Sequence, residues 1–385
     1  MKIGIVGGAL QGMEAVFLAK KAGYEAFVID RKETAPALSL ADSFEIVDVV
    51  KETEKAKKLL LDCDAVIPAN EEMDALVVLD KIMKGSEKPF LFDLNSYNIS
   101  CSKEQSNKIM AGLDVPMPEP WPQCGFPAIV KPSSQSGSIG VNAVANENEM
   151  AKALDVVKDL NDTPIIQEFV SGKSVSIEVI GNGSSATSYI TTEVVLDANY
   201  DCKMVVCEPN ILPEEDDKIF ADIGKRVAEG IKLKGLMDVE AIYTAKGLRV
   251  LEIDARIPSQ TPAAVWAATG INLLEEFVCS ALGKSTGKKS RNEYASYEHY
   301  FIDFRRITTC GEKVFGKVHK PRLEERFFGA DEAITDYYPG REWCATIINS
   351  GSSSAEVLNK RKKFIRNVME ACEAYEYSDS SPKMI

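Results

Sequence analysis

The segment 236–262 constrains the fold more than any other part of the chain, and it reads LMDVEAIYTAKGLRVLEIDARIPSQTP. Acidic and apolar residues alternate along both of its halves, and a period of two is typical of β-strands. Residues 245–247 predict a three-residue hairpin loop between the halves, with Gly247 where positive φ is required. Pairing Thr244 with Leu248 sets the register, which a bulge at Gly247 would shift by one residue.

This register gathers acidic side chains on one face of the hairpin. Glu240 comes to lie opposite Glu252. Asp238 comes to lie opposite Asp254, and Arg256 follows on the same face. Like charges directly opposite each other destabilise a sheet by roughly a few tenths of a kcal/mol per pair. Either the face is solvated, or it binds a hard cation such as Mg²⁺, which usually takes one or two carboxylates plus phosphate. The hairpin alone leaves both interpretations open.

Length and charge limit the class of protein. The 385 residues suggest two or three domains, and 45% hydrophobic with 27% charged residues is ordinary for a globular protein. The net charge of −13 argues against binding of a nucleic-acid backbone, although it is compatible with a local basic pocket for ATP. No apolar run approaches membrane-spanning length. We therefore expect neither a nucleic-acid nor a membrane partner.

Cysteine and histidine usage restricts the chemistry further. The nine cysteines form no C-x-x-C pair, which argues against a zinc ribbon or a redox motif. Scattered cysteines without a signal peptide indicate reduced thiols and a cytoplasmic protein. Only two histidines occur, His299 and His319, so histidine triads and histidine-rich metal sites are nearly excluded. Acid–base or metal chemistry must rest on carboxylates and lysines.

The first residues predict the start of a parallel α/β sheet. Residues 2–6 and 25–29 read as strands around a glycine turn and a helix, and the turn at 7–12 loosely follows the G-x-G-x-x-G pattern of dinucleotide-binding folds. Ala9 stands where the second glycine belongs, while Asp30 occupies the usual position of the ribose ligand in NAD enzymes. NAD binding is therefore a competing interpretation.

The carboxyl ends of the first strands predict a ligand crevice. In open parallel sheets, ligands bind beyond these ends. This position places Leu10, Gln11 and Glu71 near one crevice. By position alone, a loop or helix-capping role is the commoner alternative for each of them.

A lysine and a small-residue loop indicate a phosphate site further along. A helical stretch at 95–112 contains Lys103 and leads into a proline-rich boundary. A strand at 126–131 ends on Lys131 and feeds a loop at 132–140 that is rich in Ser and Gly. The N–H and hydroxyl donors of such a loop can surround phosphate oxygens, although the GK[ST] of a Walker A loop is missing. A generic surface loop is the alternative.

These pieces occur in an order that resembles the ATP-grasp superfamily of carboxylate–amine ligases. The resemblance runs from residue 1 to about residue 282. Its carriers are Lys103, the strand and loop at 126–140, the segment 166–172, and the acids of 238–240 with the segment 251–256. Each motif is weak alone, but the ordered set is specific.

The resemblance implies an α/β architecture with an ATP-grasp fold. It implies an N-terminal Rossmann-like domain over residues 1–95 and an ATP-grasp domain over 96–282, with a small lid at about 116–180. A C-terminal α+β portion follows over 283–385, in which we recognise no motif. Its end, 376–385, is expected to be frayed.

The resemblance also implies roles for individual residues, with ATP and two Mg²⁺ ions as cofactors. Two lysines would hold the phosphates, a loop would form a lid over them, and the backbone of a hinge would hold adenine. The residues implied for ATP are Lys103, Lys131, Ser136, Gly137, Ser138, Glu168, Phe169 and Val170. Those implied for Mg²⁺ are Glu240, Glu252 and Asp254. Arg256 would stabilise charge on an acyl phosphate and, with Lys131, is implied to be catalytic.

Three positions depart from the family pattern. Asp254 and Ala255 stand where the family often has Asn and Pro, but an aspartate is still a hard oxygen ligand. Ser174 stands where an acid usually holds the ribose, so that contact has no assigned residue. Lys173 adds a charge where none is expected.

Within the superfamily, the chain is most similar to the amino-acid ligases of pyrrolysine biosynthesis. The carriers are the turn 7–12 with Glu14, the strand 172–179 and the segment 237–240. This resemblance implies that 3-methyl-D-ornithine (or D-ornithine) is activated as an acyl phosphate and joined to the ε-amino group of L-lysine. The residues implied for the ornithine-like substrate are Ser176, Glu178 and Asp238, and those implied for lysine are Leu10, Gln11 and Glu71.

Three other functions compete with this one. A dipeptide ligase of the D-alanine–D-alanine type would not need the acidic residues Glu178, Asp238 and Glu71, which favour a cationic small-molecule substrate. A non-catalytic nucleotide sensor would not need the retained acids of the hairpin or Arg256. An NAD-dependent dehydrogenase would require an intact glycine fingerprint and usually a catalytic His or Lys.

Overall fold

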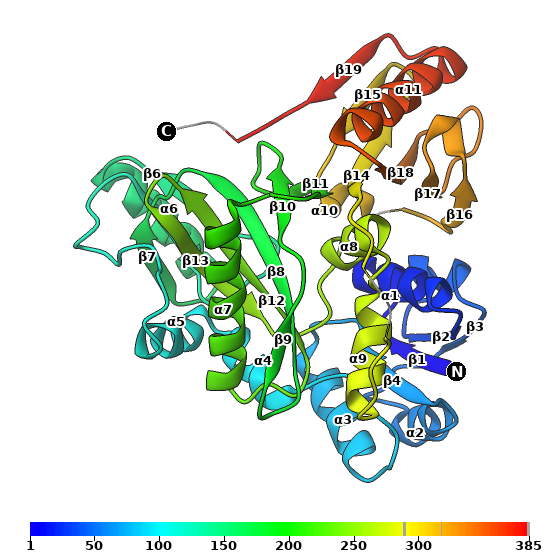
Figure 1. Cartoon of the computed structure of the whole chain (residues 1–385), viewed down its shortest axis with the longest axis horizontal. Coiled ribbons are helices and arrows are strands. Elements are labelled where there is room, and N and C mark those ends of the chain that lie inside the picture. The colour runs from blue at the N-terminus through cyan, green and yellow to red at the C-terminus, as the bar shows by residue number, and fades with distance from the viewer. Residues whose placement is uncertain (288–289, 317, 383–385) are drawn as a thin grey trace.

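The computed structural model describes residues 1–287, 290–316 and 318–382, and its N-terminal part is a parallel sheet flanked by helices (Figure 1). The strand order is β3-β2-β1-β4. The elements are β1 (Lys2–Val6), α1 (Leu10–Lys21), β2 (Glu25–Asp30), the 3-10 helix η1 (Pro36–Ser39), β3 (Ser43–Ile46), α2 (Thr53–Leu61), β4 (Ala65–Pro68) and α3 (Met73–Lys84). Buried aliphatic residues such as Ile5 and Val28 form the core of this layer.

Helix α1 begins inside the segment 7–12, which the sequence predicted to be a glycine turn. Its first residue is Leu10, so Gly12 lies inside the helix. A Cβ added at Gly12 would lie 2.2 Å from the carbonyl oxygen of Gly7. Gly12 therefore permits close packing of helix on strand, and the true turn spans only the residues before Leu10.

Two short helices link this layer to the rest of the chain, where the sequence predicted one helical stretch at 95–112. They are α4 (Leu94–Ser100) and α5 (Lys103–Gly112). Ser102 ends the continuity because it is the N-cap of α5, and its Oγ accepts a hydrogen bond from the Gln105 N–H at 3.3 Å. Lys103 therefore occupies the first helical position, beside the small-residue loop.

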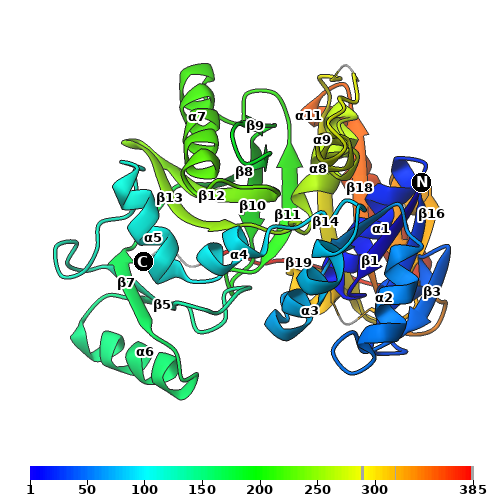
Figure 2. The same ribbon diagram turned by 90° about the horizontal axis from the view of Figure 1, so that it is seen from below.

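A small antiparallel sheet forms a separate layer. Its strand order is β6-β5-β7, and α6 packs against it. The elements are β5 (Ala128–Pro132), β6 (Asn142–Val144), α6 (Glu147–Asp159) and β7 (Pro164–Glu168). In Figure 2 this sheet and α6 lie below β12 and β13 of the large sheet.

The large sheet contains twelve strands in the main order β13-β12-β8-β10-β11-β14-β18-β17-β16. Its first strands are β8 (Lys173–Gly181), β9 (Ala186–Ser188), β10 (Thr192–Leu196), β11 (Cys202–Cys207), β12 (Leu236–Thr244) and β13 (Gly247–Asp254). The remaining ones are β14 (Tyr294–Ile302), β15 (Arg306–Thr309), β16 (Arg322–Glu325), β17 (Glu332–Thr335), β18 (Trp343–Gly351) and β19 (Glu376–Asp379). The last residues of the chain thus extend the same sheet, because β14 pairs with β11.

Helices cover the large sheet along its length. They are α7 (Glu214–Gly230), α8 (Thr261–Thr269), α9 (Leu273–Ala281), α10 (Glu312–Phe315), α11 (Ser354–Cys372) and the 3-10 helix η2 (Phe327–Gly329). Gly224 lets α7 approach β8 closely, since a Cβ there would lie 2.8 Å from Val179 Cγ2. No helix in the described part of the chain is long and apolar enough to cross a membrane.

The tail predicted to be frayed at 376–385 is partly a strand. Strand β19 pairs in parallel with β15, with Arg306 opposite Glu376 and Thr309 opposite Asp379. The Asp379 carboxylate also forms an ion pair with the buried Lys203, and its Oδ1 lies 2.5 Å from the Lys203 Nζ. These contacts hold residues 376–379 in place, while residues 383–385 lie outside the described chain.

The hairpin loop is one residue shorter than predicted. Thr244 pairs with Gly247 rather than with Leu248, so the loop contains two residues instead of three. Gly247 has a φ of +91°, as the predicted turn position requires. The predicted pairing of Thr244 with Leu248 is wrong.

A bulge further along the hairpin restores the predicted register. Leu251 is the extra residue, because the register shifts next to Glu240. Glu240 therefore lies opposite Glu252, and Asp238 lies opposite Asp254, which confirms both predicted pairs. The bulge also moves Leu251 out of the apolar face where the sequence placed it, and it lines a cavity instead.

Candidate functional site

Two rows of polar side chains run across β8, β12 and β13. Each row has one residue from each strand at directly paired positions, so its members share one face of the sheet. One row is Glu178, Asp238 and Asp254, and the other is Ser176, Glu240 and Glu252. The rows border a cavity of about 640 Å³ between the large sheet and the small sheet, lined by Asp238, Glu240, Glu252 and Asp254 among others.

Lys131 reaches into this cavity from β5 of the small sheet. Its Nζ donates to the carbonyl oxygen of Leu251, the bulged residue, at 3.2 Å. The Lys131 side chain is buried, and this burial outweighs the attraction of Glu252 and lowers the pKa of Lys131 to about 8. A lysine held in this way gains a stable charge once an anion binds beside it.

Lys103 pairs directly with the second row. Its Nζ lies 2.8 Å from Glu252 Oε2 and donates to the Gln135 carbonyl oxygen at 2.9 Å. Burial alone would raise the pKa of Glu252, but the charges of Lys103 and Lys131 outweigh it and lower the pKa. Glu252 is therefore a carboxylate with both predicted phosphate lysines beside it.

Nearby cations balance the two remaining predicted metal ligands less completely. Burial and the charge of Glu252 raise the pKa of Glu240, and burial also raises the pKa of Asp254. Among the described residues, no three His, Cys, Asp or Glu side chains converge as a ready-made metal site. Mg²⁺ usually takes only one or two carboxylates, with phosphate and water completing its shell. The donor set therefore fits Mg²⁺ bound together with a nucleotide.

Arg256 joins the hairpin to the N-terminal sheet. Its Nε lies 2.9 Å from Glu71 Oε1, and its Nη2 lies 3.0 Å from Asp254 Oδ2. The guanidinium is only 13% exposed. Burial would lower the pKa of Arg256, but the charges of Asp254 and Glu71 raise it well above its usual value. Arg256 is therefore a permanent cation at the edge of the cavity.

The loop predicted to be a lid contacts both sides of the cavity. Ser136 Oγ donates to Glu71 Oε2 at 2.8 Å, and Ser138 Oγ donates to the Tyr200 carbonyl oxygen at 2.8 Å. Gly137 and Ser138 both have a φ of 58°, so both adopt the left-handed backbone conformation. Successive N–H groups in such a turn can bind an anion. All three residues line the cavity.

The predicted hinge lines the same cavity at the end of β7. The N–H of Glu168 donates to the Glu119 carbonyl oxygen at 2.8 Å, and the N–H of Phe169 donates to the Pro127 carbonyl oxygen at 3.2 Å. These two groups are therefore engaged within the protein. Val170 follows them on the cavity wall.

Two positions that depart from the family pattern also have a structural account. Lys173 does not face the cavity, because its Nζ pairs with Glu193 at 3.2 Å and donates to the Ile211 carbonyl oxygen. Ser174 does line the cavity. The unexpected charge therefore belongs to the surface of the sheet.

The residues implied for the ornithine-like substrate are buried without partners. The Ser176 hydroxyl, both carboxylate oxygens of Glu178 and Asp238 Oδ1 have no hydrogen-bond partner in the described part of the chain. Burial raises the pKa of Glu178 to about 7 and that of Asp238 well above its usual value. Asp238 lines the cavity, whereas Ser176 and Glu178 lie behind its wall. Buried, unpaired acceptors of this kind suit a cationic ligand.

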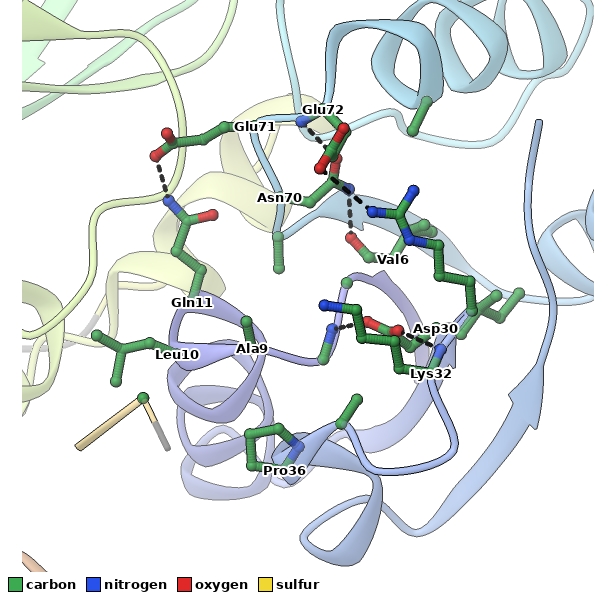
Figure 3. Close-up of a pocket in the computed structure, with 18 of the residues that line it drawn as sticks. Val6, Ala9, Leu10, Gln11, Asp30, Lys32, Pro36, Asn70, Glu71 and Glu72 are labelled. Atoms are coloured by element: carbon green, nitrogen blue, oxygen red, sulfur yellow. Dashed lines mark hydrogen bonds and ion pairs between the residues drawn. The ribbon is translucent and has the colours of Figure 1, made fainter. Parts of the chain in front are cut away.

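The crevice predicted at the N-terminal sheet is a second cavity of about 580 Å³ (Figure 3). Leu10 and Gln11 enter it from the start of α1, and Glu71 enters it after β4. The Gln11 Nε2 donates to Glu71 Oε1 at 3.0 Å, drawn as a dashed line in Figure 3. The three residues implied for lysine are thus brought together.

The same cavity contains the residue that favoured NAD binding. Asp30 Oδ2 accepts a hydrogen bond from the Gly8 N–H at 2.6 Å, and Oδ1 accepts one from the Lys32 N–H at 2.7 Å. Both carboxylate oxygens therefore have a structural role, because they hold the glycine turn and the loop after β2. This arrangement disfavours the dinucleotide interpretation.

The two cavities share part of their lining. Six residues line both of them, namely Glu71, Ser136, Gly137, Arg256, Ser259 and Glu312. Sequence analysis did not single out Ser259 or Glu312. Ser259 follows the Arg256 motif closely in the chain and could have been found from it, whereas Glu312 lies in the C-terminal portion, where no local pattern signals it. We call these six residues the junction.

Family comparisons agree with this geometry. Residues 101–260 match the ATP-grasp domain family, and residues 3–89 match the family described as PylC-like, N-terminal domain. Among solved structures, the biotin carboxylase domain of the Hydrogenobacter thermophilus 2-oxoglutarate carboxylase, in complex with MgADP, superposes with a TM-score of 0.73 and 14% identity. That likeness covers 95% of this chain and 89% of that one. The predicted α/β ATP-grasp fold is confirmed.

Two curated relatives carry the comparison further. The 3-methyl-D-ornithine–L-lysine ligase of Methanosarcina acetivorans is 34% identical over 88% of this chain and 92% of its own length. The enzyme of the same name from Methanosarcina barkeri is 38% identical over 77% of this chain and 78% of its own length. The chain therefore belongs to the 3-methyl-D-ornithine–L-lysine ligase family of ATP-dependent, ATP-grasp carbon–nitrogen ligases.

Proposed function

We propose that this chain activates the carboxylate of 3-methyl-D-ornithine, or of D-ornithine, and joins it to the ε-amino group of L-lysine. The observation that carries the proposal is that the six residues of the junction line both cavities. One cavity has the acids and lysines suited to ATP and a cationic amino acid, and the other has the residues implied for lysine. A reaction between two bound substrates requires such a connection.

ATP occupies the larger cavity in this proposal. Lys103 and Lys131 neutralise its phosphates, the loop at 136–138 closes over them, and the remaining backbone groups of the hinge at 168–170 hold adenine. Glu240, Glu252 and Asp254 would hold two Mg²⁺ ions. Bound Mg²⁺ would neutralise charge on the transferring γ-phosphoryl group.

The chemistry proceeds in two steps. The substrate carboxylate attacks the γ-phosphorus, ADP leaves, and an acyl phosphate forms. The neutral lysine amine then displaces phosphate and forms the amide. Arg256 stabilises the acyl phosphate from the junction, and the closed loop at 136–138 shields it from water.

The cationic groups of the ornithine-like substrate pair with the first row. Asp238 is on the cavity wall, and a small displacement of that wall would bring the unpaired oxygens of Glu178 to the substrate. Lysine occupies the smaller cavity with its ε-amino group toward the junction.

Product analysis tests the proposal. The protein is incubated with Mg²⁺ and ATP, and with either D-ornithine plus L-lysine or D-alanine alone. We expect ADP release and a new ornithyl-lysine amide, identified by mass, only in the first mixture. Turnover with D-alanine would favour a dipeptide ligase. ATP binding without turnover in either mixture would favour a nucleotide sensor.

A further inference from the structure

The junction contains two carboxylates, and they are held very differently. Glu71 accepts hydrogen bonds from Gln11, Ser136 and Arg256, which occupy both of its oxygens. Glu312 comes from α10, in the C-terminal portion of the chain, and reaches the same place. Either carboxylate is therefore near enough to take up a proton from a ligand at the junction.

The amine that attacks the acyl phosphate must first lose a proton. The ε-amino group of free lysine has a pKa of about 10.4, so it is an ammonium ion at neutral pH and cannot act as a nucleophile. The lysine is proposed to approach through the smaller cavity, so the proton must leave it at the junction. An acceptor with a free lone pair is needed at that point.

Glu71 is a poor candidate for this task. Burial alone would raise the pKa of Glu71, but the Arg256 guanidinium and the hydrogen bond from Ser136 help to outweigh it, and the pKa is lowered. Protonation would also break its ion pair with Arg256. Glu71 is therefore suited to position groups rather than to take up a proton.

Glu312 is held by one oxygen only. Ser259 Oγ donates to Oε2 at 3.0 Å, and Gln260 Nε2 donates to the same atom at 2.8 Å. Within the described ranges of the chain, Oε1 accepts no hydrogen bond from the protein. The carboxylate is thus fixed in place at the junction with one oxygen open to a ligand.

The residue that orients Glu312 is itself held in an uncommon conformation. Gln260 has φ 75° and ψ −57°, and the N–H of Thr261 donates to the Ser259 carbonyl oxygen at 2.9 Å. This is a classic γ-turn, which is rare and strained for a non-glycine residue. The buried Glu14 carboxylate accepts the Gln260 N–H, and Cys202 Sγ donates to Gln260 Oε1 at 2.9 Å. A strained turn with this much support is typical of a functional site.

We propose that Glu312 is the proton acceptor for the lysine ε-ammonium group, an inference that rests on the proposed function. The ammonium group transfers one proton to Glu312 Oε1, and the resulting neutral amine attacks the acyl phosphate. The C–N bond forms as the C–O bond to phosphate breaks, and the second nitrogen proton leaves with the phosphate. Glu312 returns its proton to solvent as the product departs.

Other charged and titratable groups face Glu312. They lie on α1, before and in β11, after β13 and after β4, and they are Glu14, Asp201, Cys202, Arg256 and Glu71. Lys313 is its neighbour in the chain.

A comparison of two nucleophiles tests the role. Hydroxylamine is already neutral at pH 7, so it captures the acyl phosphate as a hydroxamate without a base. We expect Glu312→Gln to form the hydroxamate from ATP and D-ornithine at nearly the wild-type rate. Its rate of ligation to lysine should fall by about 10²-fold or more at pH 7. The deficit should narrow as the pH rises toward the lysine pKa of about 10.4.

Control variants complete the design. Glu312→Asp keeps a carboxylate and should recover part of the ligation rate, and the exposed Glu325→Gln should behave as wild type. Equal loss of hydroxamate and amide in Glu312→Gln, or undiminished ligation, would overturn the inference. Failure of the wild-type protein to make the amide at all would instead reject the proposed function, on which the inference depends.

Discussion

Replacing Arg256 with lysine is expected to lower kcat by about 10²- to 10³-fold. The guanidinium contacts Glu71 through Nε and Asp254 through Nη2, and it faces both cavities. A lysine ammonium is a point charge and cannot maintain both contacts while it stabilises the acyl phosphate. Steady-state kinetics with saturating substrates measure the loss.

A matched control separates this effect from a general loss of arginine. Arg249 lies on the same strand, β13, and its Nη1 donates to the neighbouring Leu248 carbonyl oxygen rather than to a residue of the junction. Arg249→Lys should retain wild-type kcat. A kcat for Arg256→Lys close to that of Arg249→Lys would contradict the role given to Arg256.

Removing the charged side chain of Arg256 should also lower the free energy of unfolding. Arg256→Ala leaves the partly buried carboxylates of Glu71 and Asp254 without their cation, which costs about 1–3 kcal/mol. Denaturant unfolding of the two variants therefore distinguishes stability from catalysis. Arg256→Lys should be much the more stable of the pair.

Replacing Glu178 with glutamine should weaken binding of D-ornithine while stabilising the free protein. Loss of a charge-assisted hydrogen bond of about 1.5–3 kcal/mol raises the KM for D-ornithine by about 10- to 100-fold. The KM for ATP should stay unchanged. In the free protein, Glu178 is fully buried and no ion pair among the described residues compensates its charge, so removing that charge relieves a desolvation penalty.

The opposite signs make this prediction specific. Kinetics give the KM values, and thermal unfolding without substrates gives the change in stability. The exposed Glu215→Gln on α7 should change neither quantity. An unchanged KM for D-ornithine in Glu178→Gln would remove Glu178 from the substrate site.

The sequence was most informative where chemistry and periodicity coincide. The pairs Glu240–Glu252 and Asp238–Asp254 could be predicted because the acids alternate on both strands. Lys131 and the loop at 136–138 could be expected side by side because strand β5 leads from the lysine into the loop, and both line the larger cavity. These features depend on residues that are close together in the chain.

Contacts between distant segments could not be predicted. The carbonyl oxygen of the bulged Leu251 accepts a hydrogen bond from Lys131 of β5, and nothing in the hairpin sequence signals the bulge. Glu312 approaches Gln260 only because β14 joins the large sheet next to β11. Strand β19 likewise depends on β15 and on the ion pair from Lys203, so its sequence alone suggested a frayed end.

The domain boundaries and site roles stay predictions. The boundary at 282/283 in particular separates elements that share one sheet, since β11 pairs with β14. The roles of the ATP, metal and substrate residues rest on their positions around the two cavities. A structure with ligands addresses all of them together.

The most direct test of the account is a crystal structure with a non-hydrolysable ATP analogue, Mg²⁺, D-ornithine and L-lysine. We expect the ornithine carboxylate between the γ-phosphate and the junction, with the lysine ε-nitrogen about 3–3.5 Å from the carboxylate carbon and beside Glu312. Lysine bound in the larger cavity, or reacting atoms separated by a closed wall at the junction, would contradict it.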